Sequence, residues 1–243
     1  MSLPRFHIPE AAPGARLSFP EHIAHHAREV LRLRAGATVR IFDGAGQEYE
    51  ALLESVTRQG VTAHLTGAVP ARPEPQLRIV LALSPLKGDR MEIVIQKATE
   101  LGVAAVWPVV TARTDAAARP ALKGSRQERW DKVASSAAEQ CGRAVVPDVA
   151  PTSTLDRLLA EPFDGTRLLF LETPGEPGLT DAPPPAGAIL ALVGPAGGWE
   201  PQEARRLQGA GFRAVSLGPR ILRAETAAIA AVTALQVLWG DLG

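Results

Sequence analysis

The pattern of hydrophobic and polar positions changes once along the chain, near residues 69–78. Apolar and polar residues alternate over short distances before this segment, whereas continuous apolar runs alternate with helix-like stretches after it. The segment itself carries three prolines in six positions, which breaks any regular element. We therefore predict two domains, one at residues 1–72 and one at residues 73–243.

Short strands dominate the predicted first domain. The β-like stretches are residues 37–44, 48–56 and 60–69. Residues 20–36 precede them with helical spacing, which places Ile23, Ala27, Val30 and Leu31 on one face and Gly36 at the end. This order of elements predicts a small β-barrel-like domain.

The predicted second domain alternates strands and helices. The apolar runs are residues 77–84, 103–110, 166–172, 188–194 and 213–218. The helical stretches are residues 89–102, 126–142, 200–211 and 224–240. Continuous apolar strands that alternate with helices indicate a parallel sheet covered on both faces. The fold class predicted for this part is therefore α/β.

Composition narrows the class of protein. The 243 residues include 46% hydrophobic and 21% charged residues, a globular balance, and the formal net charge of zero argues against a general polyanion binder. Cys141 is the only cysteine, which excludes an intrachain disulfide and a cysteine-built zinc site. The five histidines form no metal-binding motif, so we expect no metal. Neither a signal peptide nor an apolar run of about 18 residues is present, so we expect a cytoplasmic protein with no membrane contact.

Two glycine-containing loops follow predicted strands, at residues 194–198 and 218–223. In an open parallel sheet, ligands bind outside the carboxyl ends of the strands. Neither loop contains a lysine or a phosphate-binding motif, and no dinucleotide fingerprint is present. Amides and carbonyls in such loops suit adenine and ribose, which favours an adenosyl ligand without phosphates. The alternative is that each loop is an ordinary strand-to-helix turn.

The stretches "LVGPAGGWEPQE" and "LGPRILRAETAA" resemble the signature of the bacterial 16S ribosomal RNA uridine-N3 methyltransferases, which belong to the SPOUT superfamily. "KGDRMEIVIQKATELGV", "VWPVVTARTD" and "AAEQCGRAVVP" continue the likeness in the same order, and "VLRLRAGATVRIFDGAGQEYEA" looks like the family's N-terminal PUA-like barrel. The likeness covers nearly the whole chain.

The resemblance implies a SPOUT-type parallel sheet with a C-terminal trefoil knot, a PUA-like β-barrel that binds RNA, and S-adenosylmethionine as cofactor. It also implies a homodimer that acts on ribosomal RNA in the assembled small subunit. The last helix suits a dimer interface through Ile229, Val232, Leu235 and Trp239, although such a stripe is as often plain core. The residues assigned to the cofactor are Leu171, Glu172, Gly194, Pro195, Gly197, Gly198, Leu217, Gly218, Ile221, Leu222, Arg223 and Thr226.

The chain departs from this family at Ala196, where the usual motif has glutamate. The backbone part of cofactor binding should survive, because Pro195 and the glycines remain. Whatever the carboxylate does is absent, which places the rate in question. This departure supports an alternative function, a non-catalytic RNA-binding or ribosome-assembly protein of the same fold. Another alternative is a SPOUT methyltransferase that acts on a different RNA, such as transfer RNA.

Methylation of uracil N3 requires loss of a proton and stabilisation of the resulting anion, a task that suits a guanidinium. Arg223 is the first choice, because it follows the cofactor loop directly, and Glu225 is a weak candidate for the base. The remaining basic residues considered for RNA binding are Arg5, Arg32, Arg34, Lys87, Arg90, Lys97, Arg113 and Arg143. For Arg32 and Arg34 a solvated helix end is an equal alternative.

Overall fold

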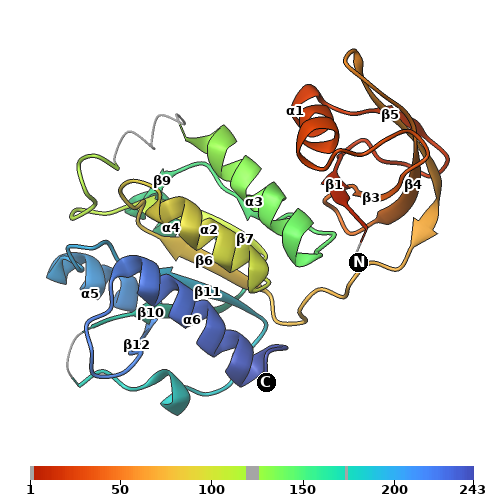
Figure 1. The fold of residues 1–243 in the computed structure, drawn as a ribbon. Helices are drawn as coiled ribbons and strands as arrows, with labels where there is room; N and C mark the ends of the chain where they lie inside the picture. Colours follow the sequence, from red (N-terminus) through yellow and green to blue (C-terminus); the bar gives the residue numbers. More distant parts are fainter. Residues whose placement is uncertain (1–2, 119–125, 173–174) are drawn as a thin grey trace. The chain divides into compact units, whose positions relative to one another are not determined.

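The computed structural model describes residues 3–118, 126–172 and 175–243 and divides the chain into two compact units (Figure 1). The first unit contains residues 1–74 together with residues 135–146, and the second contains residues 75–134 and 147–243. The division therefore falls inside the proline-rich segment. Residues 135–146 also belong to the first unit, although the sequence analysis placed them in the second domain.

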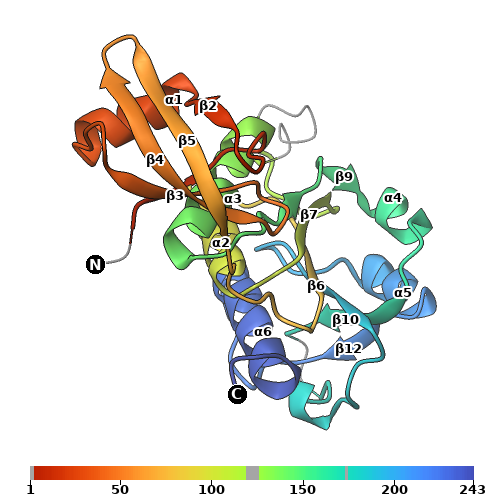
Figure 2. The ribbon, with the colours of Figure 1, turned by 90° about the vertical axis from the view of Figure 1, so that its right-hand side faces the viewer.

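A five-stranded sheet in the order β1-β3-β4-β5-β2 forms the first unit (Figure 2). Its strands are β1 (Arg5–His7), β2 (Arg16–Ser18), β3 (Thr38–Phe42), β4 (Glu48–Thr57) and β5 (Gly60–Val69). β1 is parallel to β3, and the other pairs are antiparallel. Alternate residues such as Val39, Ala51 and Leu53 are fully buried in one core, which accounts for the alternation seen in the sequence.

The helix of the first unit ends earlier than its periodicity predicted. It consists of α1 (Glu21–His25) and a π-helical continuation (His26–Val30). Ile23 and Ala27 are buried, whereas Val30 and Leu31, which the helical spacing placed on the same face, are 61% and 39% exposed. The Leu31 N–H donates to the His26 carbonyl five residues earlier, so the wider π-helical turn changes the spacing that an α-helix would give to these positions.

A seven-stranded sheet forms the second unit, in the order β12-β10-β11-β6-β7-β8 with β9 also paired to β7. Its strands are β6 (Ile79–Leu83), β7 (Ala105–Val110), β8 (Asp148–Val149), β9 (Ser153–Thr154), β10 (Gly165–Phe170), β11 (Ala188–Val193) and β12 (Arg213–Val215). Neighbouring strands run parallel throughout, which confirms the parallel sheet predicted from the sequence.

Helices cover both faces of this sheet. They are α2 (Arg90–Glu100), α3 (Gln127–Cys141), α4 (Leu155–Ala160), α5 (Pro201–Gly209) and α6 (Ala224–Trp239), with a 3-10 turn at Leu179–Asp181. α6 packs against α2 and against β6 and β11, while residues of α4 and α5 share an apolar cluster with the opposite face of the sheet. Val232 and Leu235 of α6 are fully buried within the chain, so these two members of the predicted interface stripe belong to the core.

The register of three adjacent strands brings their carboxyl ends together. Phe170 at the end of β10 lies opposite Val193 of β11 and Val215 of β12. The loops that follow these residues therefore leave the sheet at the same edge, as parallel strands require. No helix among the described residues is long and apolar enough to cross a membrane.

Candidate active site

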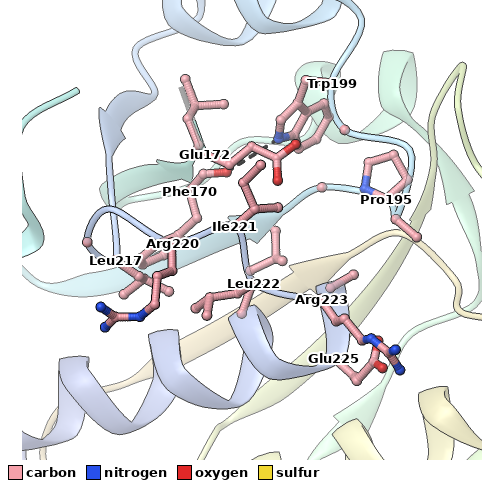
Figure 3. Close-up of a pocket in the computed structure, with 18 of the residues that line it drawn as sticks. Phe170, Glu172, Pro195, Trp199, Leu217, Arg220, Ile221, Leu222, Arg223 and Glu225 are labelled. Carbon is pink, nitrogen blue, oxygen red and sulfur yellow. Dashed lines mark hydrogen bonds between the residues drawn. The ribbon is translucent and has the colours of Figure 1, made fainter. Parts of the chain in front are cut away.

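The three loops after β10, β11 and β12 line a cavity of about 480 Å³ (Figure 3). This volume lies in the range of about 300–1,000 Å³ that is usual for small-molecule sites. The lining combines main chain, apolar side chains and a few charged groups. Its residues are Arg90, Phe170, Leu171, Glu172, Val193, Gly194, Pro195, Ala196, Gly198, Trp199, Leu217, Gly218, Arg220, Ile221, Leu222, Arg223, Ala224, Glu225 and Ala227.

The loop after β11 is a tight turn that needs glycine. The Gly198 N–H donates to the Pro195 carbonyl at 2.9 Å, and Gly198 has a φ of +70°, which disfavours any residue with a side chain. A Cβ added at Gly194 would lie 2.6 Å from Nε1 of Trp199. Side chains are therefore excluded from both ends of this turn, and the main chain forms the wall of the cavity.

The loop after β12 leads directly into α6. Arg223 is the N-cap residue of that helix, and its carbonyl accepts a hydrogen bond from the Ala227 N–H at 2.8 Å. Ile221 also lines the cavity although its side chain is 79% exposed, so a ligand in the cavity would cover apolar surface. Figure 3 places Arg223 and Glu225 together at one end of the cavity and Arg220 beside Leu217 at another.

Arg90 joins the same end of the cavity from the start of α2. Its Nε lies 3.6 Å from Oε1 of Glu225, and the side chains are 49% and 17% exposed. We considered Arg90 for RNA binding and Glu225 for the base, but the structure brings the two together. Glu225 therefore faces a guanidinium of the protein at this end of the cavity.

Most of the residues predicted to bind the cofactor line this cavity, and the two exceptions are Gly197 and Thr226. The Gly197 carbonyl instead accepts a hydrogen bond from Nη1 of Arg113 at 3.2 Å. Arg113 also forms an ion pair with Glu200 at 2.7 Å, so this candidate RNA ligand connects the glycine loop to the start of α5.

Sequence reasoning missed several lining residues. Trp199 donates from Nε1 to the Phe170 carbonyl at 3.4 Å and so joins two of the three loops. Its position directly after the double glycine was a usable signal. Arg220 lies inside the predicted loop but was not assigned to the cofactor. Nothing in the local sequence marks Arg90, because its place at the cavity depends on the packing of α2 against α6.

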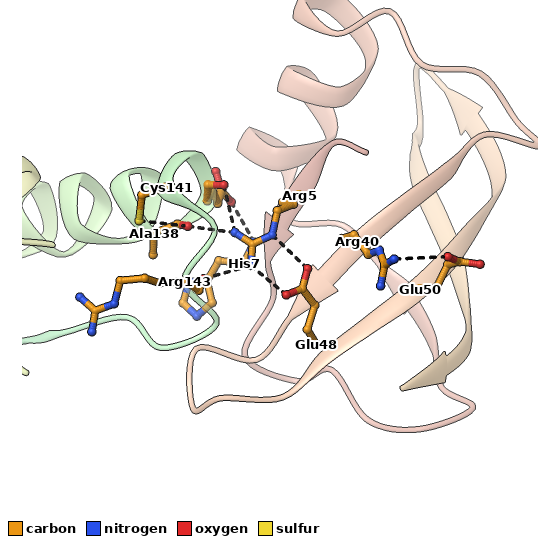
Figure 4. A network of polar contacts seen from close by, with 9 residues as sticks. Arg5, His7, Arg40, Glu48, Glu50, Ala138, Cys141 and Arg143 are labelled. Atoms are coloured by element: carbon orange, nitrogen blue, oxygen red, sulfur yellow. Dashed lines mark hydrogen bonds and ion pairs between the residues drawn. The ribbon is translucent and has the colours of Figure 1, made fainter. Parts of the chain in front are cut away.

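Two arginines considered for RNA binding instead belong to a partly buried polar network of the first unit (Figure 4). Arg5 forms an ion pair with Glu48 at 3.0 Å and donates to three carbonyls at the end of α3, those of Ala138, Glu139 and Arg143. The Arg143 guanidinium is ion-paired with Glu74. Their charges are used inside the unit, and we no longer propose either residue as an RNA ligand.

His7 belongs to the same region. Its Nδ1 lies 2.8 Å from the Ser135 hydroxyl, and its ring stacks on Phe42 with a centroid distance of 5.2 Å. Burial lowers the pKa of the His7 imidazole, against weaker opposing effects of Asp43 and Glu10. Burial also raises the pKa of the nearby Glu139 carboxyl.

The other candidate RNA ligands differ in availability. Arg32, Arg34 and Lys87 are exposed, whereas Lys97 is half-buried and pairs with Glu100 at 2.8 Å on the same helix. Arg32 adopts a φ of +52°, which is uncommon for a residue with a side chain. In the described parts of the chain, no group of three or more histidine, cysteine or acidic side chains is placed to hold a metal ion.

Comparisons with known proteins agree across the chain. Residues 72–236 match the family model of the RNA methyltransferase domain, and residues 19–66 match that of the RNA methyltransferase PUA domain. The chain is 31% identical over 244 residues to ribosomal RNA small subunit methyltransferase E of Bacillus subtilis, covering 96% of this chain and 94% of the relative. The enzyme of the same name from Synechocystis is 34% identical over 238 residues, covering 95% and 76%.

Solved structures give the same result. Ribosomal RNA small subunit methyltransferase E from Neisseria gonorrhoeae, bound to S-adenosylmethionine, is 37% identical with a TM-score of 0.90, covering 99% of this chain and 100% of the other. A methyltransferase from Legionella pneumophila in complex with the same cofactor is 34% identical with a TM-score of 0.92, covering 100% of both chains. The chain therefore belongs to the family of ribosomal RNA small subunit methyltransferase E.

Proposed function

We propose that this protein transfers the methyl group of S-adenosylmethionine to N3 of a uridine in the 16S ribosomal RNA of the small subunit. The observation that carries the proposal is the cavity formed by the three loops after β10, β11 and β12. Relatives that match this chain over nearly its whole length are named for methylation of small-subunit ribosomal RNA, and two solved neighbours contain S-adenosylmethionine.

The residues of the cavity fit this cofactor. Gly194 and Gly198 carry no side chain that would cover the main chain of this turn, because a Cβ at Gly194 would meet Trp199 and Gly198 adopts a φ of +70°. Apolar side chains such as Ile221 and Leu222 suit the faces of a purine ring. When bound, S-adenosylmethionine supplies a methyl group activated by its sulfonium.

Arg223 is the residue that we assign to stabilisation of the uracil anion. It lines the cavity at the start of α6, and no carboxylate lies at ion-pair distance from it within the described residues. The charge of the anion spreads over O2 and O4, and a preorganised donor at such a site is worth about 10²–10³-fold in rate. The helix N-terminus adds a partial positive charge.

We assign removal of the N3 proton to water rather than to Glu225. The Glu225 carboxylate already faces the Arg90 guanidinium, with Oε1 3.6 Å from Nε, so it is engaged by a protein side chain. Once the anion is stabilised by a cation, the proton leaves to solvent without a dedicated base.

Ribosomal RNA would be held by exposed cations through phosphate contacts. We propose Arg32 and Arg34 of the first unit and Lys87 of the second for this role, because all three are exposed. The substrate would be the assembled small subunit in the cytoplasm, where its folded RNA presents a fixed shape to both units.

We also propose that the C-terminal segment forms a trefoil knot. The placement of β12 beside β10, with three loops meeting at one cavity, supports this threading. Single molecules pulled from both ends should then reach a shorter unfolded length than 243 residues allow. The full length would exclude a knot.

A homodimer is the assembly that we propose. Val237 and Leu238 on α6 are 50% and 40% exposed, and Ile93 on the neighbouring α2 is 45% exposed. Such an apolar surface across two packed helices favours association. Analytical ultracentrifugation should show a dimer, and Val237→Glu should weaken the association of its two chains. A wild-type protein that is monomeric at all concentrations would contradict the proposed homodimer.

Ala196 is the observation that favours a second function, a non-catalytic RNA-binding or assembly protein. It lines the cavity but has no carboxylate. Purified protein, labelled S-adenosylmethionine and unmethylated small subunits separate the two functions, with transfer RNA as a parallel substrate. Label in the small subunit supports the methyltransferase. Label in transfer RNA alone changes the substrate, and cofactor binding without transfer favours the second function.

A further inference from the structure

Arg90 is held at the cavity by a single carboxylate contact. Its Nε faces Glu225, and no other ion pair or hydrogen bond involves its guanidinium within the described residues. Because the Glu225 side chain is 17% exposed while that of Arg90 is 49% exposed, a partly buried carboxylate faces a cation that stays accessible. The two terminal nitrogens of Arg90 are therefore available to a ligand.

This end of the cavity concentrates positive charge. Arg90 begins α2 and Arg223 precedes α6, and neither helix has a side chain that caps its first N–H groups. Two guanidinium groups and two helix N-termini thus meet opposite the single carboxylate of Glu225. The acidic side chains of Asp89 and Glu92, near the start of α2, form ion pairs with Arg129.

We propose that Arg90, positioned by Glu225, is a second cation that stabilises the uracil anion together with Arg223. This inference rests on the proposed function. The anion carries its charge on two oxygens, and two guanidinium groups match that distribution. The N3 proton leaves to water, the N3 electron pair forms the bond to the methyl carbon, and the carbon–sulfur bond breaks. A sulfonium and an anion thereby become two neutral products.

A phosphate contact of Arg90 would behave differently from this role. Loss of a phosphate contact weakens RNA binding, raises KM and reduces the salt dependence of binding. Loss of a cation that acts on the anion lowers kcat and leaves the KM for S-adenosylmethionine nearly unchanged. Glu225 acts through Arg90, so Glu225→Gln should lower kcat in the same direction.

The test compares Arg90→Gln, Arg90→Lys and Glu225→Gln with wild-type protein on small subunits that contain uridine or 5-fluorouridine. Fluorine makes the N3–H group more acidic, so the uracil anion requires less stabilisation by the protein. Arg129→Gln is the matched control, because it removes an equal charge near the start of α2 but does not line the cavity. Titration calorimetry with S-adenosylmethionine verifies that each variant keeps a folded cavity.

We expect Arg90→Gln to lower kcat by about 10²-fold on uridine and by clearly less on 5-fluorouridine. Arg90→Lys should retain part of the rate, and Arg129→Gln should match the wild type. Equal losses on both substrates, or a raised KM for RNA with kcat unchanged, would overturn the assignment of Arg90. Wild-type protein that is inactive on both substrates would instead overturn the proposed function, and the inference with it.

Discussion

The ion pair between Arg5 and Glu48 offers a sharp test of how burial sets the value of a salt bridge. The Arg5 and Glu48 side chains are 13% and 9% exposed and lie 3.0 Å apart. Arg16 and Glu54 form a pair in the same sheet at 3.1 Å, but Arg16 is 75% exposed. The two pairs have nearly the same distance, so substitution of each arginine by alanine isolates the effect of burial and of additional partners.

The expected losses differ strongly. Arg5→Ala leaves the buried Glu48 carboxylate unpaired and removes the donor to three carbonyls, and breaking such a buried pair costs about 3–5 kcal/mol. Arg16→Ala removes a solvated pair, which is worth about 0–1 kcal/mol. Because about 1.4 kcal/mol is a factor of ten in an equilibrium constant, the Arg5 variant should open its sheet at least about 10²-fold more often.

Hydrogen exchange measured by mass spectrometry on the full chain reports this opening directly. Amides of β3 and β4 should lose protection by about 10²-fold or more in Arg5→Ala and by less than about fivefold in Arg16→Ala. The β11 strand of the second unit serves as an internal control and should keep its protection. Equal losses in the two variants would refute the argument from burial.

Three further predictions follow from single positions. Gly198→Ala should weaken binding of S-adenosylmethionine about tenfold in titration calorimetry, because the φ of +70° costs about 1–2 kcal/mol with a side chain. The control is Gly209→Ala in α5, where an added Cβ meets no atom within 4 Å, and this variant should bind S-adenosylmethionine as the wild type does. Equal affinities of the two variants would contradict the role of the turn. Arg113→Ala loses its hydrogen bond to the Gly197 carbonyl. Because this contact is exposed, the KM for the cofactor should rise only about two- to fivefold. An unchanged KM would mean that the glycine loop keeps its conformation without Arg113. Since burial lowers the pKa of His7 from 6.5, the native state binds this proton less readily than the unfolded chain, so stability should fall as the pH drops below about 6.5. In His7→Gln, the free energy of unfolding measured with urea should depend less on pH in this range. An equal pH dependence in the variant and the wild type would refute the assignment to His7.

The parallel sheet and the two glycine loops were readable from the sequence because both are local signals. A buried parallel strand appears as a continuous apolar run, and glycine directly after it marks a turn at the ligand edge. The strands β8 and β9 were missed, since two residues each give no periodicity. The π-helical turn after α1 was also missed, because nothing in the spacing of apolar residues separates it from an α-helix.

Contacts between residues far apart in the chain could not be predicted from the sequence. Arg90 and Glu225 meet only because α2 packs against α6, and Arg5 reaches carbonyls more than 130 positions away. An arginine that binds RNA and an arginine that holds two segments together look alike in a sequence. Burial and the number of satisfied donors separate them, and both are properties of the fold.

The chemical identity of the methylated nucleoside tests the central claim most directly. Small subunits treated with the protein and S-adenosylmethionine would be digested to nucleosides and separated by liquid chromatography with mass spectrometry against standards. The account predicts 3-methyluridine, formed by the wild type and strongly reduced in Arg223→Ala. A methyl group on C5 or on the ribose 2′-oxygen would contradict it, because neither product requires the uracil N3 anion that the cations of this cavity are proposed to stabilise.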